Sequence, residues 1–158
     1  MLTLKACLKE GLKEAGIKAG DAGDWRLGEL IIEKALYISL RQAVAAQGAM
    51  QSYLGCDAEG CEVYGMQMEV KSALVLLSPK GDGGYGVEAF AEEVMNVLLS
   101  ATQRLGIRAI CCEEMAFDSL RDCFRQEIVL TQQVMAYGAR TDEGIALEEF
   151  RVLAEVQS

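Results

Sequence analysis

Residues 63–78, VYGMQMEVKSALVLLS, decide the fold class of this 158-residue chain. Apolar and polar side chains alternate through the first half of the stretch, which predicts a β-strand with one buried face. The side chains expected on that face are Tyr64, Met66, Met68, Val70, Leu74 and Leu76. Both faces become apolar at residues 73–77, so the strand is expected to end buried on both sides. Pro79 should end the strand, because proline has no N–H to continue the ladder.

Helices are predicted on both sides of this strand. Residues 2–15 and 87–105 carry apolar side chains three and four positions apart. This spacing is typical of an amphipathic helix that packs one face on a core. Glycine-rich stretches at residues 18–28, 48–62 and 80–86 are expected to form the loops between elements.

Further strands are predicted from shorter alternating stretches. One strand is expected at about residues 35–46. Residues 107–137 should form a hairpin whose turn lies at residues 118–122. Gln126 and Gln132 interrupt the apolar face of this hairpin, which predicts that part of the face is solvated or lies in an interface.

The order of these elements predicts an α+β fold. Helices do not alternate with every strand, which excludes a doubly wound parallel sheet. We expect a mostly antiparallel or mixed sheet of about five strands, with two main helices packed on one face. The chain is interpreted as a single domain, residues 1–158, with a core at 1–137 and a C-terminal extension at 138–158. A polar linker is expected at 138–144, followed by a terminal strand at 145–156, for which a helix is the alternative.

The charge of the chain limits its partners. There are 15 Lys and Arg residues against 24 Asp and Glu residues, which gives a formal net charge of −9. Nucleic-acid binding needs a basic face that displaces counterions, so we expect no nucleic-acid partner. We expect no membrane partner either, because no apolar run approaches the roughly 20 residues of a transmembrane helix. The lysine-containing N-terminus does not resemble a signal peptide, so an intracellular location is expected.

The sequence offers no catalytic set. It contains no histidine, the commonest general base and the commonest metal ligand. The stretch KGDGGYG at residues 80–86 lacks the order of glycine, lysine and serine or threonine that a phosphate-binding loop needs. We therefore predict no catalytic residue, no cofactor and no metal.

The six cysteines are expected to be reduced thiols. Cys56 and Cys61 have four residues between them. Spectator thiols are favoured there over a local disulfide or a zinc site, because a second suitable pair of zinc ligands is missing. In the stretch CCEE at residues 111–114, acidic neighbours disfavour a reactive thiolate, so cysteines inside a strand are favoured over a nucleophile.

Three stretches together resemble the tail terminator, or tail completion, proteins of long-tailed bacteriophages and prophages. They are the strand and glycine-rich loop MEVKSALVLLSPKGDGG (68–84), the helix VEAFAEEVMNVLLSA (87–101) and the hairpin IRAICCEEMAFDSLRDCFRQEIVLTQQV (107–134). An amphipathic helix at the N-terminus agrees with the same arrangement. The resemblance lies in the order of the elements over about residues 63–137, and no single residue is a family signature.

The resemblance implies an assembly role without catalysis. Family members are small α/β domains that form a hexameric ring on the end of the tail tube, where the ring stops tube growth and faces the head-side connector. For this chain it implies a homo-oligomeric ring, a tail tube protein and a head–tail connector protein as partners, and a location first in the bacterial cytoplasm and then in the virion tail. The candidate interface residues are Trp25, Tyr53, Asp82 and Tyr85.

Two other functions stay open at this point. The chain is compatible with another virion component, either a head–tail connector or a tail tube subunit, and a tube subunit would polymerise into long tubes. A small enzyme that uses acidic residues such as Glu113 and Glu114 is the remaining alternative. It would need a pocket in which carboxylates converge and have perturbed pKa values.

Overall fold

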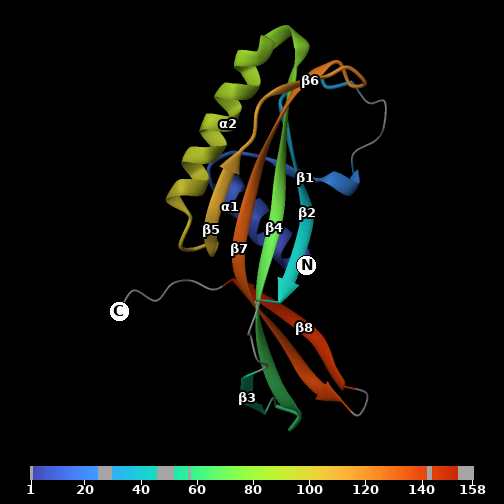
Figure 1. The fold of residues 1–158 in the computed structure, drawn as a ribbon, viewed down its shortest axis with the longest axis vertical. Coiled ribbons are helices and arrows are strands. Elements are labelled where there is room, and N and C mark those ends of the chain that lie inside the picture. Colours follow the sequence, from blue (N-terminus) through green and yellow to red (C-terminus); the bar gives the residue numbers. More distant parts are fainter. Residues whose placement is uncertain (1, 25–29, 46–51, 57, 142–143, 153–158) are drawn as a thin grey trace.

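The computed structural model describes residues 2–24, 30–45, 52–56, 58–141 and 144–152 (Figure 1). The helices are α1 (Leu2–Glu14) and α2 (Gly83–Ser100), with short 3-10 turns η1 (Ala22–Asp24) and η2 (Lys80–Asp82). The strands are β1 (Ala19–Asp21), β2 (Ala35–Ala45), β3 (Ser52–Cys56), β4 (Glu62–Pro79), β5 (Ile107–Cys112), β6 (Ala116–Asp118), β7 (Cys123–Thr141) and β8 (Gly144–Val152).

Two long antiparallel strands, β4 and β7, form the axis of the sheet. They pair without interruption from Val63 opposite Ala139 to Pro79 opposite Cys123. The edge of β4 that faces away from β7 pairs with β2 and then with β3. The edge of β7 that faces away from β4 pairs with β6, β5 and β8 in turn. The sheet is therefore mixed only through β1, which runs parallel to β2.

The fold class predicted from the sequence is confirmed, but the predicted size of the sheet is wrong. The described residues form an eight-stranded sheet, not one of about five strands. The reason is the length of β4 and β7, because each strand is long enough to hold several short strands along one edge. The strands β1, β3 and β6 have three to five residues each and leave almost no periodic signal.

Both helices pack on the same face of the sheet, as expected. Leu8 and Leu12 of α1 and Val94 and Leu98 of α2 share one buried cluster with Leu74 of β4. The even-numbered residues of β4 face this cluster, and the odd-numbered residues face the other side. A smaller cluster there contains Val75, Leu77 and Cys123, with Ile31 and Tyr37 packed against it. Figure 1 shows this second face toward the viewer, with α1 behind the strands.

One end of the sheet extends beyond the helices. It consists of β3, residues 62–67 of β4, residues 135–141 of β7, and β8, and Figure 1 shows it as the lower part of the molecule. We call this part the β-arm. The buried clusters lie in the helix-covered part. Among the β-arm residues whose burial is described, Ala136 is the one hydrophobic side chain in the buried core.

Several loop boundaries predicted from glycine content are wrong. Residues 19–21 within the predicted loop 18–28 form β1, and residues 52–56 within the predicted connection 48–62 form β3. Residues 138–141 continue β7 instead of starting a polar linker. In each case pairing with a neighbouring strand stabilises backbone that the local sequence would leave as loop.

The predicted terminal strand is present as β8, which pairs with β7 from Gly144 opposite Thr141 to Val152 opposite Val134.

The second helix begins earlier and ends earlier than predicted. It starts at Gly83 and ends at Ser100, whereas the periodicity predicted residues 87–105. Gly84 and Gly86 belong to its first turn because they lie against other parts of the chain. A Cβ atom on Gly86 would come within 2.7 Å of Ser78 Oγ, and one on Gly84 would come within 2.9 Å of the Met115 side chain. These glycines therefore allow close packing of the helix start.

The predicted solvated position of Gln132 is also wrong. Its side chain is fully buried, and its Nε2 donates a hydrogen bond of 2.8 Å to the carbonyl oxygen of Leu105. Leu105 lies in the turn after α2, whose last residues have carbonyl groups without helical partners. Gln132 therefore satisfies the backbone where α2 leads into β5, and the polar residue is part of the core.

Candidate interaction surfaces

The structure places the predicted interface residues at opposite ends of the molecule. Asp82 and Tyr85 lie where η2 leads into α2, at the upper end in Figure 1. Tyr53 lies on β3, in the β-arm. Trp25 lies outside the described residues. The described candidate residues therefore mark two separate surfaces of the molecule.

The upper end exposes Tyr85 on the first turn of α2, with 86% of its surface accessible. Asp82 is also exposed, and its side chain makes no capping hydrogen bond to the helix. An aromatic ring held on a helix costs little conformational entropy when it binds, which is why such rings often anchor protein interfaces.

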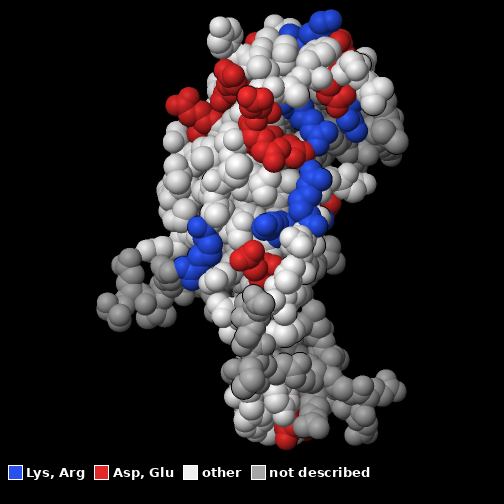
Figure 2. All heavy atoms as spheres, in the orientation of Figure 1, with Lys and Arg blue, Asp and Glu red and all other residues white. Residues whose placement is uncertain are grey.

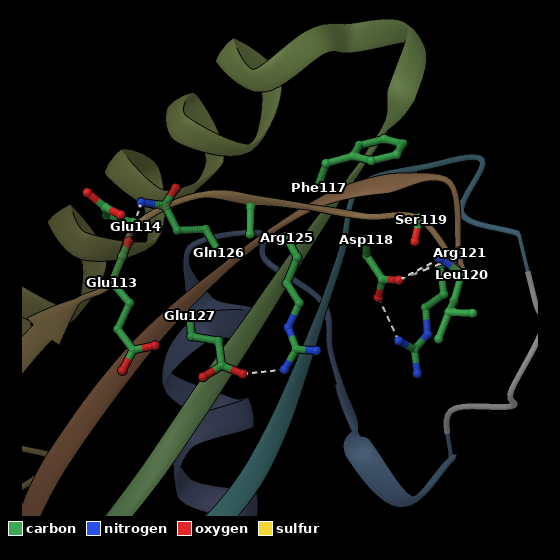
Figure 3. Close-up of a pocket in the computed structure, with 11 residues that line it drawn as sticks. Glu113, Glu114, Phe117, Asp118, Ser119, Leu120, Arg121, Arg125, Gln126 and Glu127 are labelled. Atoms are coloured by element: carbon green, nitrogen blue, oxygen red, sulfur yellow. Dashed lines mark hydrogen bonds and ion pairs between the residues drawn. The ribbon is translucent and has the colours of Figure 1, made fainter.

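The turn between β6 and β7 holds a third exposed residue at this end, Leu120. Asp118 Oδ1 accepts the backbone N–H of Leu120 at 3.0 Å and that of Arg121 at 3.3 Å. Asp118 Oδ2 accepts Arg121 Nη1 at 2.7 Å, and Figure 3 shows these two side chains facing each other. Burial opposes the charge of this carboxylate, but the bonds from Arg121 and the backbone prevail and lower the pKa of Asp118. The turn is therefore rigid, while Leu120 is 81% exposed.

The base of this turn is packed by aromatic rings. Phe117 and Phe124 meet edge to face with ring centroids 5.2 Å apart. Lys80 Nζ lies 6.0 Å from the centroid of the Phe117 ring and 3.4 Å from Asp122 Oδ1. These contacts attach the turn to the end of β4, so the turn and the start of α2 form one surface. We call this surface, made of Lys80, Tyr85, Phe117, Leu120 and Asp122, the apex.

A shallow hollow of about 570 Å³ lies beside the apex (Figure 3). Its lining residues are Glu113, Glu114, Ala116, Phe117, Asp118, Ser119, Leu120, Arg121, Arg125, Gln126 and Glu127. Glu127 Oε1 accepts hydrogen bonds from Arg125 and, at 2.9 Å, from Arg41 Nη2. Asp118 is bound by Arg121, so two of the four acidic side chains are already neutralised by arginine. Glu113 and Glu114 are exposed to solvent.

The β-arm exposes Tyr53, at 58%, on the strand opposite Tyr64. The two rings meet edge to face with centroids 5.7 Å apart. The Tyr53 hydroxyl lies 3.5 Å from Cys56 Sγ, and this hydrogen bond raises the pKa of the phenol. Neither Cys56 nor Cys61 takes part in a disulfide.

A second hollow, of about 390 Å³, lies between the C-terminal ends of α1 and α2. It is lined by Gly11, Glu14, Ala15, Val97, Ser100, Ala101 and Arg104. Arg104 Nη1 and Glu14 Oε2 form an ion pair of 2.6 Å across it. We call it the helix groove. Neither the helix groove nor the exposure of Leu120 could be predicted from the sequence, because exposed residues at the ends of elements have no periodic signal.

In comparisons with known proteins, no protein-family model and no curated protein matches this chain. Among the described helices, none is long and apolar enough to cross a membrane. Figure 2 shows acidic and basic side chains mixed over the helix-bearing part of the molecule, without a continuous basic face in that view.

Proposed function

We propose that the protein is a structural assembly protein of a phage or prophage tail. It forms a hexameric ring that caps the tail tube and joins it to the head connector. Its partners are further copies of itself, a tail tube protein and a head–tail connector protein. The ring assembles in the bacterial cytoplasm and becomes part of the virion tail.

The observation that carries this proposal is the direction of the strands in the β-arm. β3 is antiparallel to β4, β4 to β7, and β7 to β8, so the outer strands β3 and β8 run in opposite directions. Within the described residues, each outer strand pairs on one side only. If copies are related by rotation about an axis along the strands, β8 of one copy meets β3 of the next in antiparallel orientation.

Such a contact joins two different strands and is therefore heterologous. Heterologous contacts give closed rings when the rotation closes and open helical filaments when it does not. Free strand edges are also the part of a sheet most prone to pair with another chain. The β-arm thus supports a ring of identical subunits, with the helix-covered parts arranged around it.

The charged residues beside the apex support a binding role over catalysis. Arg121 binds Asp118, while Arg41 and Arg125 share Glu127, so both carboxylates are already engaged by arginine side chains. Networks of this kind stabilise a surface and fix its shape. A tail tube subunit is the second candidate, because the same strand edges would support a contact that does not close.

Negative-stain electron microscopy of the purified full-length protein tests the proposal. We expect closed rings of uniform diameter at micromolar concentration. Open tubes that lengthen with protein concentration would instead assign the chain to the tube subunits. Monomers at every protein concentration would contradict the proposed ring.

A further inference from the structure

We propose that an acidic flank of α2 in one copy docks against a basic flank of α1 in the next copy. This inference rests on the proposed ring, and it names a second contact between its subunits, in the helix-covered part of the molecule. The two helices lie side by side on one face of the sheet and meet at the helix groove. The flank of each helix that faces away from the other helix is called its outer flank.

The outer flank of α2 is acidic. Glu88 and Glu92 are four positions apart, so they lie on one side of the helix, and both residues are exposed. The helix contains no lysine or arginine, and within the described residues neither glutamate makes an ion pair. Like charges at this spacing destabilise a helix unless a cation approaches them. Tyr85 and Leu99, which are 86% and 58% exposed, follow the same side and add apolar surface to it.

This acidic flank faces away from α1. Successive residues of a helix are turned by about 100°, which places Glu93 and Val97 on the other flank of α2. Glu93 binds Lys34 at 3.3 Å, and Val97 lines the helix groove beside α1. Figure 1 shows α2 at the left edge of the molecule, so the flank opposite α1 faces outward on that side.

The outer flank of α1 is basic. Lys5, Lys9 and Lys13 are four positions apart, so they follow one side of the helix. Lys5 Nζ binds Asp21 Oδ2 at 2.9 Å, which shows that this side of α1 faces β1. The hydrogen bond from Lys5 lowers the pKa of Asp21, with smaller contributions from the Gly23 backbone and from the charge of Lys9. In the part of the chain that the structure describes, Lys9 and Lys13 make no ion pair.

One rotation brings the two outer flanks together. Figure 1 shows β1 and β8 on the right of the molecule, and α2 and β3 on the left. The rotation that places β8 of one copy beside β3 of the next therefore also places the β1 side of the first copy beside α2 of the next.

The heights of the two flanks along the strands are similar, as this rotation requires. β1, which Lys5 binds, is level with residues 74–76 of β4. Lys34, which binds α2, directly precedes the residue that pairs with Leu77. Both flanks therefore lie beside the same part of β4.

The unpaired charges favour a second copy as the partner. Within one chain the two outer flanks point in opposite directions, so Glu88 and Glu92 do not meet Lys9 and Lys13. Docking between copies pairs acid with base at every contact of the ring. The chain has a net charge of −9, so two copies repel each other over most of their surface. The contact between opposite charges thus selects the orientation in which copies associate.

Charge reversal with complementation tests the contact. Glu88→Lys/Glu92→Lys makes both outer flanks basic, and Lys9→Glu/Lys13→Glu makes both acidic. Each variant alone should need at least about tenfold more protein than the wild type for half-maximal assembly, because like charges then face each other. An equimolar mixture should assemble at the wild-type concentration, with the two variants in equal numbers. Native mass spectrometry gives this composition from the masses.

Glu69→Lys is the control, because Glu69 is exposed on the side of the sheet opposite the helices, and it should leave assembly unchanged. Circular dichroism checks that every variant is folded. Rings formed by either reversed variant alone at the wild-type concentration would overturn the inference and leave the proposed ring standing. A folded mixture that fails to assemble would do the same. Open tubes or dimers, lost in each variant and restored in the mixture, would support the contact and reject the ring. A wild-type protein that never assembles would reject both.

Discussion

At the scale of the residue, Asp118 explains how an exposed turn keeps one shape. Its carboxylate accepts two backbone N–H groups and the Arg121 guanidinium, and its side chain is only 12% exposed. The same bonds lower its pKa below the ordinary value of 3.8. A carboxylate with a lowered pKa stabilises the fold above its unfolded-state pKa, and this stabilisation is lost as the pH falls through the folded-state pKa.

Replacement of Asp118 by Asn is therefore expected to lower the free energy of unfolding by about 1–2 kcal/mol at pH 7. The difference from wild type should shrink as the pH falls below about 4, because the carboxylate of the unfolded chain then binds a proton more readily than the carboxylate of the folded protein. Urea unfolding at pH 7 and at pH 3 measures both effects. Asp122→Asn is the control, since its ion pair with Lys80 is exposed and contributes little. An unchanged pH dependence in Asp118→Asn would contradict this account.

At the scale of the element, the start of α2 depends on glycines in a stretch that is predicted from the sequence to be a loop. Gly86 is within the helix, and a Cβ atom there would meet both Ser78 Oγ and Asp82 Cβ at 2.7 Å. Gly86→Ala should therefore cost about 1–3 kcal/mol of stability, as overpacking does. Gly81→Ala is the matched control, because open space surrounds that position and it should be near neutral. Thermal unfolding of the two variants measures this difference. Equal melting temperatures would contradict the close approach of Gly86 to Ser78 and Asp82.

The elements that could be predicted from the sequence are those with a long repeat. The strand at β4, the strand at β2 and the helix α1 lie where alternation or helical spacing placed them, within a few residues. β1, β3 and β6 could not be predicted, because their stability comes from pairing with β2, β4 and β7. The burial of Gln132 could not be predicted for a similar reason, since the side chain binds a backbone carbonyl 27 positions away in the sequence.

At the scale of the whole molecule, the interaction surfaces could be predicted only in part. Tyr53 and Tyr85 are exposed as an interface requires, but their positions at opposite ends of the molecule could not be predicted from the sequence. Leu120 and the helix groove follow from tertiary packing of a turn and of two helix ends. The β-arm follows from the unequal lengths of the helices and the strands β4 and β7.

The ring is the central claim, and it depends on the edges of β3 and β8 that pair with no other strand in the described part of the chain. Successive backbone N–H groups in a strand point to opposite edges, so one of Ile145→Pro and Ala146→Pro removes a bond to β7 and the other removes only an outward N–H. The outward variant should keep the fold, as checked by circular dichroism, and lose the ability to form rings.

Native mass spectrometry over a concentration series, on the wild-type protein and these two variants, is the most direct measurement. We predict a wild-type assembly that grows to a single closed mass of about six copies and then stays constant at higher concentration. One proline variant should remain a folded monomer. A wild-type mass that stays at one copy, or rings that persist in both folded proline variants, would contradict the account.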